Sequence, residues 1–164
     1  MRTNPFSSPS VLAAKLGAAL VVAALALTGC SSGPGERSET TLTKSADGAT
    51  LTVTYVAEGD DVVQQTTENV VVYAESGIAD RAAAEDQVGE LVEQYKGIRG
   101  VDHAIEFGDT ELVETVTMNY TDLDVEAFAK ATGAGAEEDP AAVTKVSLKE
   151  AVASLTGAGF TEVE

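Results

Sequence analysis

Apolar and polar residues alternate along residues 50–57, which predicts a β-strand with one buried face. The apolar face consists of Leu51, Val53, Tyr55 and Ala57, and threonines fill most of the other face. Glu-Gly-Asp at 58–60 is typical of a turn, and the β-rich residues 61–73 return from it. This pattern predicts a first β-hairpin.

A second region of alternation predicts another hairpin. The apolar face of its first strand includes a histidine and consists of Val101, His103, Ile105 and Phe107. After a Gly-Asp turn at 108–109, the returning strand carries the apolar residues Leu112, Val116, Met118 and Tyr120. Glu114 interrupts that second face, so we expect a bulge or a local change of register there.

Three further segments have the period of an α-helix. The first has Asp80 as its predicted N-cap, stops near Gly97 and carries the apolar stripe Ala84, Val88, Leu91, Val92 and Tyr95. Residues 121–124 (TDLD) resemble a capping box that opens a short helix, with Leu123, Phe128 and Ala131 inward, followed by a loop over 131–140. Residues 147–150 (SLKE) form a second capping box before a helix that ends at Gly157 and has the apolar stripe Leu148, Ala151, Val152 and Leu155. Residues 160–163 favour an edge strand.

The order of these elements predicts an α+β fold. Two β-hairpins, each followed by a helix, and a C-terminal helix would form a sheet with the helices packed on one side. The length after residue 39 suffices for one hydrophobic core. We therefore expect a single α+β domain over residues 40–164.

Residues 1–29 have the features of an export signal. The uncharged run Leu16–Leu27 has 12 residues, whereas a helix that spans about 30 Å of hydrocarbon needs about 20. Thr28 and Gly29 precede Cys30, which is the only cysteine in the chain. This pattern predicts a lipobox, with cleavage before Cys30, a thioether to diacylglycerol on its thiol, and fatty acids such as palmitate. An uncleaved N-terminal anchor is the alternative.

The segment after Cys30 predicts how the domain is held. Residues 31–38 contain no apolar residue, so we expect a lipidated N-terminus and flexible tether over residues 30–39. The expected location is the extracytoplasmic face of the cell membrane, with the lipid on Cys30 as the anchor.

The charge of the chain excludes one class of partner. The formal net charge is −17, and because residues 1–29 contain two basic and no acidic residues, the chain from Cys30 carries −19. Such a surface repels phosphate backbones, so no nucleic-acid partner is expected. The expected partners are the membrane, through Cys30, and an unknown protein or small ligand.

No arrangement typical of an enzyme is visible. His103 is the only histidine, its sequence neighbours point to the opposite face, and we expect it to be buried and hydrogen-bonded. There is no nucleophile elbow or glycine-rich phosphate loop, and Gly97 and Gly100 are interpreted as helix stop and strand entry. Acidic turns at 60–61, 109–111 and 122–124 could bind calcium weakly, but none forms the twelve-residue calcium loop, so we interpret them as solvated turns. We expect no catalytic residue, cofactor or metal site.

Several motifs resemble a known family. Residues 95–103 (YKGIRGVDH) are similar to the tyrosine-lysine-glycine-x-x-glycine-valine-x-histidine signature of the YehR-like bacterial lipoproteins. The likeness continues through 115–121 (TVTMNYT) and from 147–150 (SLKE) to 159–163 (GFTEV). The resemblance implies a small α+β lipoprotein domain at the cell envelope. That family has no assigned activity, so the resemblance implies no functional residue beyond the lipidated cysteine.

Three classes of function remain. Anchoring, a compact domain and the lack of catalytic motifs favour a non-catalytic binding or interaction module. The alternative is a structural or assembly accessory of a cell-envelope protein complex, which would have a protein partner and no ligand pocket. A hydrolase with an unrecognised carboxylate pair is the least favoured.

Overall fold

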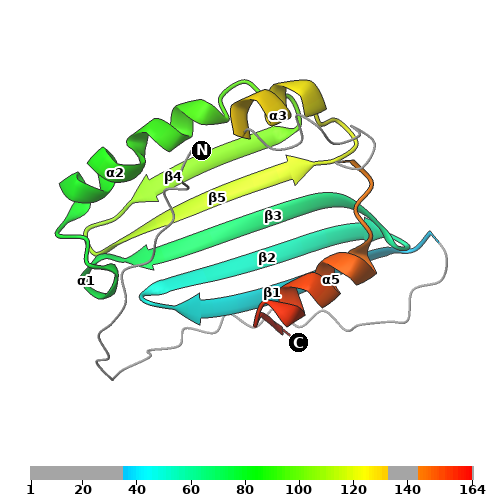
Figure 1. Ribbon diagram of the computed structural model, residues 1–164, viewed down its shortest axis with the longest axis horizontal. Helices are drawn as coiled ribbons and strands as arrows, with labels where there is room; N and C mark the ends of the chain where they lie inside the picture. Colours follow the sequence, from blue (N-terminus) through cyan, green and yellow to red (C-terminus); the bar gives the residue numbers. More distant parts are fainter. Residues whose placement is uncertain (1–34, 133–143, 164) are drawn as a thin grey trace, which may run out of the picture.

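The computed structural model describes residues 35–132 and 144–163, which form one sheet with helices on one of its faces (Figure 1). The strands are β1 (Arg37–Ala46), β2 (Ala49–Glu58), β3 (Asp61–Val72), β4 (Val101–Phe107), β5 (Glu111–Asn119) and β6 (Thr161–Glu162). The helices are α1 (Tyr73–Ser76), α2 (Arg81–Gln94), α3 (Val125–Thr132) and α5 (Leu148–Gly157). The strand order is β4-β5-β3-β2-β1-β6, and every neighbouring pair is antiparallel.

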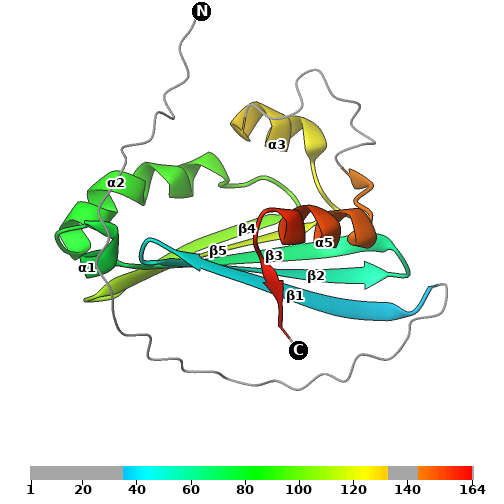
Figure 2. The ribbon, with the colours of Figure 1, turned by 60° about the horizontal axis from the view of Figure 1, so that its bottom comes forward.

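The helices and the sheet form two layers. Figure 2 shows the sheet nearly edge-on, with α2, α3 and α5 on the same side. α5 lies over the β1 and β2 side, whereas α2 and α3 lie over the β4 and β5 side (Figure 1). The predicted α+β fold with helices on one side of a sheet is confirmed.

β1 is the strand that the alternation of residues does not predict. Its ten residues include one large apolar side chain, the fully buried Leu42, among threonine, serine and charged residues. The strand forms because it pairs with β2 over its whole length, from Arg37↔Glu58 to Ala46↔Ala49, and because threonine favours strands. The first unit is therefore three-stranded, and β1 begins at Arg37, within the segment expected to be a tether. The predicted return strand also ends earlier, because Tyr73 opens α1.

The bulge expected at Glu114 is wrong. β5 pairs in continuous register with β3 and with β4 across this residue. Glu114 keeps its place on the helix-covered face because its carboxylate bonds to His103. The register shift in the sheet lies instead between Val56 and Ala57, where β2 meets the start of β3.

Two of the three predicted helix starts are confirmed. The Asp80 carboxylate accepts a hydrogen bond from the backbone N–H of Ala83, and Ser147 Oγ accepts one from that of Glu150. The third is wrong, because Asp124 and not Thr121 caps α3, through the N–H of Ala127 at 3.0 Å. Thr121 is held in a turn by the Asn119 side chain, to which its hydroxyl donates at 2.7 Å.

Other predicted elements are found with shorter bounds or fall partly outside the described residues. β6 is the expected edge strand and pairs with β1 at Leu42 and Thr43. In α2, Ala84 of the predicted stripe is buried, and the side chains of residues 91 and 92 lie outside those described. The predicted loop over 131–140 lies largely outside the described residues, and α3 runs to Thr132.

The opposite face of the sheet carries mainly threonines and charged side chains. Thr41, Thr54, Thr66 and Thr117 are register partners in one row across four strands. Hydroxyl pairs bridge Thr41 to Thr54 at 3.0 Å and Thr66 to Thr117 at 3.2 Å. Such a composition is typical of the solvated face of an antiparallel sheet. We call it the outer face, and the helix-covered side the inner face.

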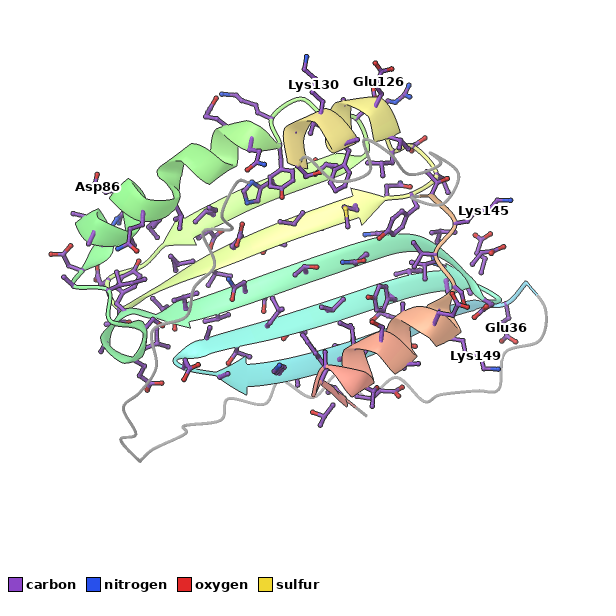
Figure 3. All side chains as sticks on the ribbon, in the orientation of Figure 1. Glu36, Asp86, Glu126, Lys130, Lys145 and Lys149 are labelled. Atoms are coloured by element: carbon purple, nitrogen blue, oxygen red, sulfur yellow. The ribbon has the colours of Figure 1, made fainter. Side chains whose placement is uncertain are left out.

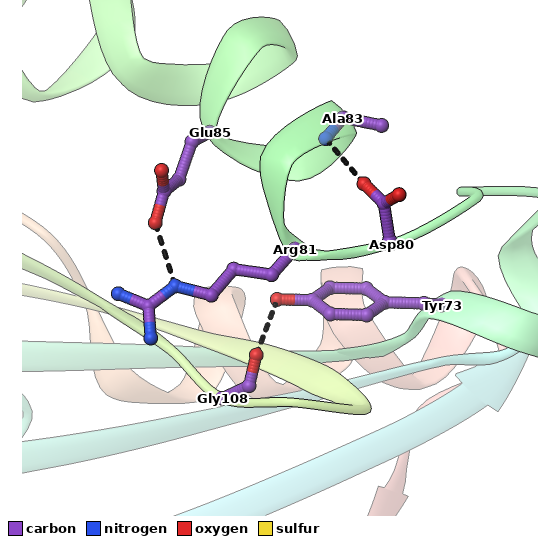
Figure 4. Close-up of polar contacts among 6 residues, drawn as sticks. All are labelled: Tyr73, Asp80, Arg81, Ala83, Glu85 and Gly108. Carbon is purple, nitrogen blue, oxygen red and sulfur yellow. Dashed lines mark hydrogen bonds and ion pairs between the residues drawn. The ribbon is translucent and has the colours of Figure 1, made fainter.

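Two junctions fix the helices to the ends of the strands. At one end, the buried Tyr73 donates a hydrogen bond to the carbonyl of Gly108 at 3.3 Å, which joins α1 to the β4–β5 turn (Figure 4). Arg81 and Glu85 form an exposed pair at 2.7 Å on the first turns of α2. At the other end, the β2–β3 turn holds α5, because the Asp60 carboxylate accepts from the hydroxyl of Ser147 at 2.7 Å and from the N–H of Lys149 at 3.0 Å. The labelled Lys149 side chain extends away from the molecule, so its backbone makes this contact (Figure 3).

The Asp60 junction predicts a pH-dependent contribution to stability. The hydrogen bonds from Ser147 and Lys149 lower the pKa of the Asp60 carboxyl below its ordinary value. A carboxyl with a lower pKa in the folded state stabilises the fold above its unfolded-state pKa of about 3.9 and loses this effect as the pH falls through the folded-state pKa. Asp60→Ala should therefore lower the Tm at pH 7, and its difference from the wild type should shrink below about pH 4.

Melting curves between pH 2.5 and 7 would measure this effect. Asp61→Ala is the matched control because it removes the same charge from the neighbouring residue. The Asp61 carboxylate makes no hydrogen bond within the described residues. Equal losses of Tm for the two variants, or a loss at Asp60 that does not change with pH, would contradict the assignment.

Candidate functional site

The middle of the inner face of β3 is polar, although β3 is a central strand of the sheet that the helices cover. Gln65, Thr67 and Asn69 are half-buried and alternate with residues of the outer face. Their register partners on β2 are the apolar Tyr55, Val53 and Leu51, which places all three on the inner face. No described helix lies over β3, which runs between α5 on one side and α2 with α3 on the other (Figure 1). We call these three residues the polar strip.

The apolar core forms clusters on either side of the polar strip, and Tyr120 packs against one cluster on each side. On its β1–β2 side, buried residues pack with α5, among them Leu42, Val53 and Phe160. On its β4–β5 side, a second cluster centres on Tyr73, Ala84 and Leu112, and a third on Ile98, Val101 and Leu123. The inner face thus has two apolar flanks and a polar centre.

A chain of hydrogen bonds orders one end of the strip. The Tyr120 hydroxyl donates to Gln65 Oε1 at 2.9 Å, and Gln65 Nε2 donates to Thr67 Oγ1 at 3.1 Å. Burial raises the pKa of Tyr120 to about 12, and the nearby Tyr55 adds to the rise. The phenol therefore stays protonated at neutral pH and remains a donor.

A carboxylate and a histidine lie beside the other end of the strip. Glu114 is the register partner of Asn69, and its Oε1 lies 2.9 Å from His103 Nε2. The His103 side chain is 3% exposed and the Glu114 side chain 25%, so the carboxylate is the accessible member of the pair. The Tyr95 ring meets the imidazole edge-on at 5.1 Å. His103 Nδ1 is buried and has no hydrogen-bond partner among the described residues.

The sequence prediction for His103 is confirmed in part and extended by the structure. The residue is buried and hydrogen-bonded on the face of Val101, Ile105 and Phe107, as expected. Its partner, Glu114, was not predicted, and the available signal was the interruption of an apolar face by a carboxylate. Neither ring nitrogen of His103 contacts a hydroxyl of the described residues, so the pair does not activate a Ser or Thr nucleophile there. The arrangement offers hydrogen-bond donors, acceptors and one negative charge.

The acidic turns do not converge on a shared centre. Both oxygens of the Asp60 carboxylate are engaged by α5, and the Asp124 carboxylate caps α3. Within residues 35–132 and 144–163, no group of three or more metal-ligating side chains could hold an ion. The labelled charged side chains in Figure 3 point outward from the periphery of the molecule, as expected for a solvated surface.

Cys30 lies outside the described residues. Among the residues that the structure does describe, no helix is long and apolar enough to span a membrane. The lipidation site therefore stays a prediction from the sequence.

The antiparallel sheet with helices on one face and a polar centre defines a small α+β domain. Comparison with known proteins assigns this domain to a family. Residues 38–161 match the family described as "Protein of unknown function (DUF1307)", so the chain belongs to that family. The uncharacterised lipoprotein Lin0239 of Listeria innocua is 33% identical over 147 residues, which cover 88% of this chain and 92% of that protein. The uncharacterised lipoprotein YehR of Escherichia coli is 28% identical over 151 residues, or 88% of this chain and 94% of YehR.

A solved structure agrees with the fold. The NMR structure of Escherichia coli YehR has a TM-score of 0.64 and 25% identity, and it covers 79% of this chain and 92% of that chain. The resemblance to the YehR-like lipoproteins is therefore confirmed. The lipoprotein names of the relatives support a membrane anchor for this chain.

Proposed function

We propose that this lipoprotein is a non-catalytic binding protein at the extracytoplasmic face of the cell membrane. A diacylglycerol on Cys30 anchors it, and the polar strip on the inner face holds its ligand. The observation that carries the proposal is the polar middle of the inner face of β3, between two apolar flanks and with no described helix above it.

Stability alone does not favour polar side chains at these positions. Burying apolar area contributes about 25 cal/mol per Å², and the register partners Val53 and Val116 on either side of Thr67 gain from it. A valine at 67 and leucines at 65 and 69 would join the two flanks into one core. Apolar walls around a few oriented polar groups are instead typical of a ligand site.

The geometry at His103 supports binding over catalysis. A general acid or base must reach the substrate, but the imidazole lies behind Glu114 and beneath the edge of Tyr95. Glu114 is the only acidic residue on the inner face of strands β1 to β5, so these strands bring no second carboxylate of a glycosidase-type pair beside it.

The outer face favours the alternative, an accessory of an envelope protein complex. No described helix covers it (Figure 2), and a flat protein partner could reach its threonines and Glu68. The two functions thus use opposite faces of the same sheet.

Consecutive residues of β3 provide the test, because successive side chains of a strand point to opposite faces. A photo-crosslinking amino acid at position 69 samples the inner face, and one at position 68 samples the outer face. We expect irradiated cells to give a reproducible adduct at 69, identified by mass spectrometry of the crosslinked peptide, and none at 68. A protein adduct at 68 alone would support the accessory role, and no adduct at either position would overturn the proposal.

A further inference from the structure

We infer that the ligand of the polar strip carries an organic ammonium group, which binds the carboxylate of Glu114. The inference rests on the proposed function and names the chemical class of ligand for that site. Its basis is the position of one carboxylate, the histidine behind it and the side chains around it.

Glu114 is an isolated negative charge in the middle of the inner face. Among the inner-face positions of β1 to β5, it is the only Asp or Glu, and Lys44 is the only Lys or Arg. Lys44 lies on β1 and donates to the carbonyl of Ala158 at 2.7 Å, so it does not neutralise Glu114. Placing a charge among apolar side chains costs free energy unless a partner compensates it.

His103 compensates this cost only in part. His103 Nε2 and Glu114 Oε1 form a hydrogen bond of 2.9 Å, and no other described residue forms an ion pair with this carboxylate. His103 Nδ1 is buried without a hydrogen-bond partner among the described residues, so the contact with Glu114 is the one described hydrogen bond of the imidazole. The buried His103 is therefore a positioning residue that holds the Glu114 carboxylate in place. The partly exposed carboxylate can accept a hydrogen bond from a ligand.

The surroundings of Glu114 select the class of cation. Its register partners are Ile105 on β4 and Asn69 on β3, and Leu112 and Val116 flank it on β5. Apolar neighbours suit a cation with a hydrocarbon body, and the Asn69 carbonyl offers a second acceptor for N–H groups. A metal ion would need more ligands than the described residues bring together. Glu114 would repel an anionic ligand, and the formal net charge of −19 from Cys30 onward favours cations at the surface.

Two sources share this chemistry, namely free amines and the lysine or amino-terminal groups of peptides. Calorimetric titration with 1,5-diaminopentane and with trilysine distinguishes them, and 1,5-pentanediol is the uncharged analogue. All six strands lie between Arg37 and Glu162, so a chain from residue 30 with Cys30→Ser contains the whole sheet. We expect at least one ammonium probe to bind and the diol not to bind.

The decisive comparison is between two variants with the same net charge. Glu114→Gln should weaken binding by about tenfold or more, as expected for loss of a charge-assisted hydrogen bond. Glu68→Gln removes a charge from the outer face and should leave the affinity unchanged. Equal losses in both variants, or binding of the diol, would show unspecific attraction and overturn the inference.

A measurement on the wild type covers the case in which Glu114→Gln does not fold. In NMR spectra, the side-chain amide of Asn69 should shift on addition of the ammonium probe that binds, and the amide of Glu68 should not. An unshifted Asn69 overturns the inference. If no ammonium probe binds while crosslinking at position 69 succeeds, the binding function stands and only the class of ligand is wrong.

Discussion

Gly100→Ala is expected to destabilise the domain by roughly 3 kcal/mol or more, because the backbone at this residue has a positive φ and touches another segment. Gly100 has φ +81, and a Cβ there would lie 2.6 Å from Cα and 2.7 Å from N of Leu123. Both atoms belong to the backbone that leads into α3, so no side-chain rotation relieves the overlap. The Gly100 carbonyl also accepts from the N–H of Asn119 at 2.7 Å, which restrains the loop from moving away.

Gly97→Ala is the matched control for this prediction. Gly97 has a similar φ of +78, but no atom lies within 4 Å of a Cβ placed there. Gly97→Ala should therefore destabilise the domain only through the left-handed backbone conformation, by about 1–2 kcal/mol. Urea unfolding of both variants measures the difference. Equal costs for the two glycines would show that the close approach to Leu123 does not limit stability.

The two glycines illustrate what the sequence motif means structurally. In residues 95–103, Tyr95 caps α2 and packs on His103, Gly97 and Gly100 turn the chain, and Val101 enters β4. The interpretation of these glycines as helix stop and strand entry agrees with their positive φ angles. The contact of Gly100 with Leu123 was not predictable, because it joins segments that local patterns treat separately.

The fold was predictable wherever an element carried its own apolar pattern. β2, β4 and β5 each place at least three apolar residues on one face, and Asp80 and Ser147 mark their helices by capping. β1 has only Leu42 as a large buried residue, so its strand structure depends on pairing with β2. Non-local pairing of this kind leaves little signal in a local window.

The candidate site was predictable only in fragments. The inward position of His103 follows from its strand, but Glu114 lies eleven residues away on the neighbouring strand, where it interrupts an apolar face. Residues 64–69 (QQTTEN) are polar on both faces, so the sequence alone does not show which residues the helices would flank. The polar strip is defined only by the three-dimensional arrangement, in which α5 and α2 lie on either side of β3.

Cys30→Ala is expected to abolish lipid labelling completely, because the chain has no other cysteine to receive a thioether-linked diacylglycerol. Without that modification, cleavage before residue 30 should also fail, and residues 1–29 should remain on the protein. Growth with an alkyne-tagged fatty acid measures the label, and intact mass measures the processing. Ser31→Ala is the matched control, since it changes the adjacent residue and keeps the thiol.

The two readouts separate the lipobox from the alternative of an uncleaved N-terminal anchor. A wild-type chain that begins at Cys30 and carries the label, beside an unlabelled Cys30→Ala variant of full length, fits only the lipobox. A wild-type chain that keeps residues 1–29 and takes no label would show that the apolar run Leu16–Leu27 holds the protein at the membrane. The six strands pair with one another between Arg37 and Glu162, so Cys30→Ala changes no residue of the sheet and should leave its fold intact. Binding at the polar strip should therefore survive Cys30→Ala, while attachment to the membrane through lipid is lost.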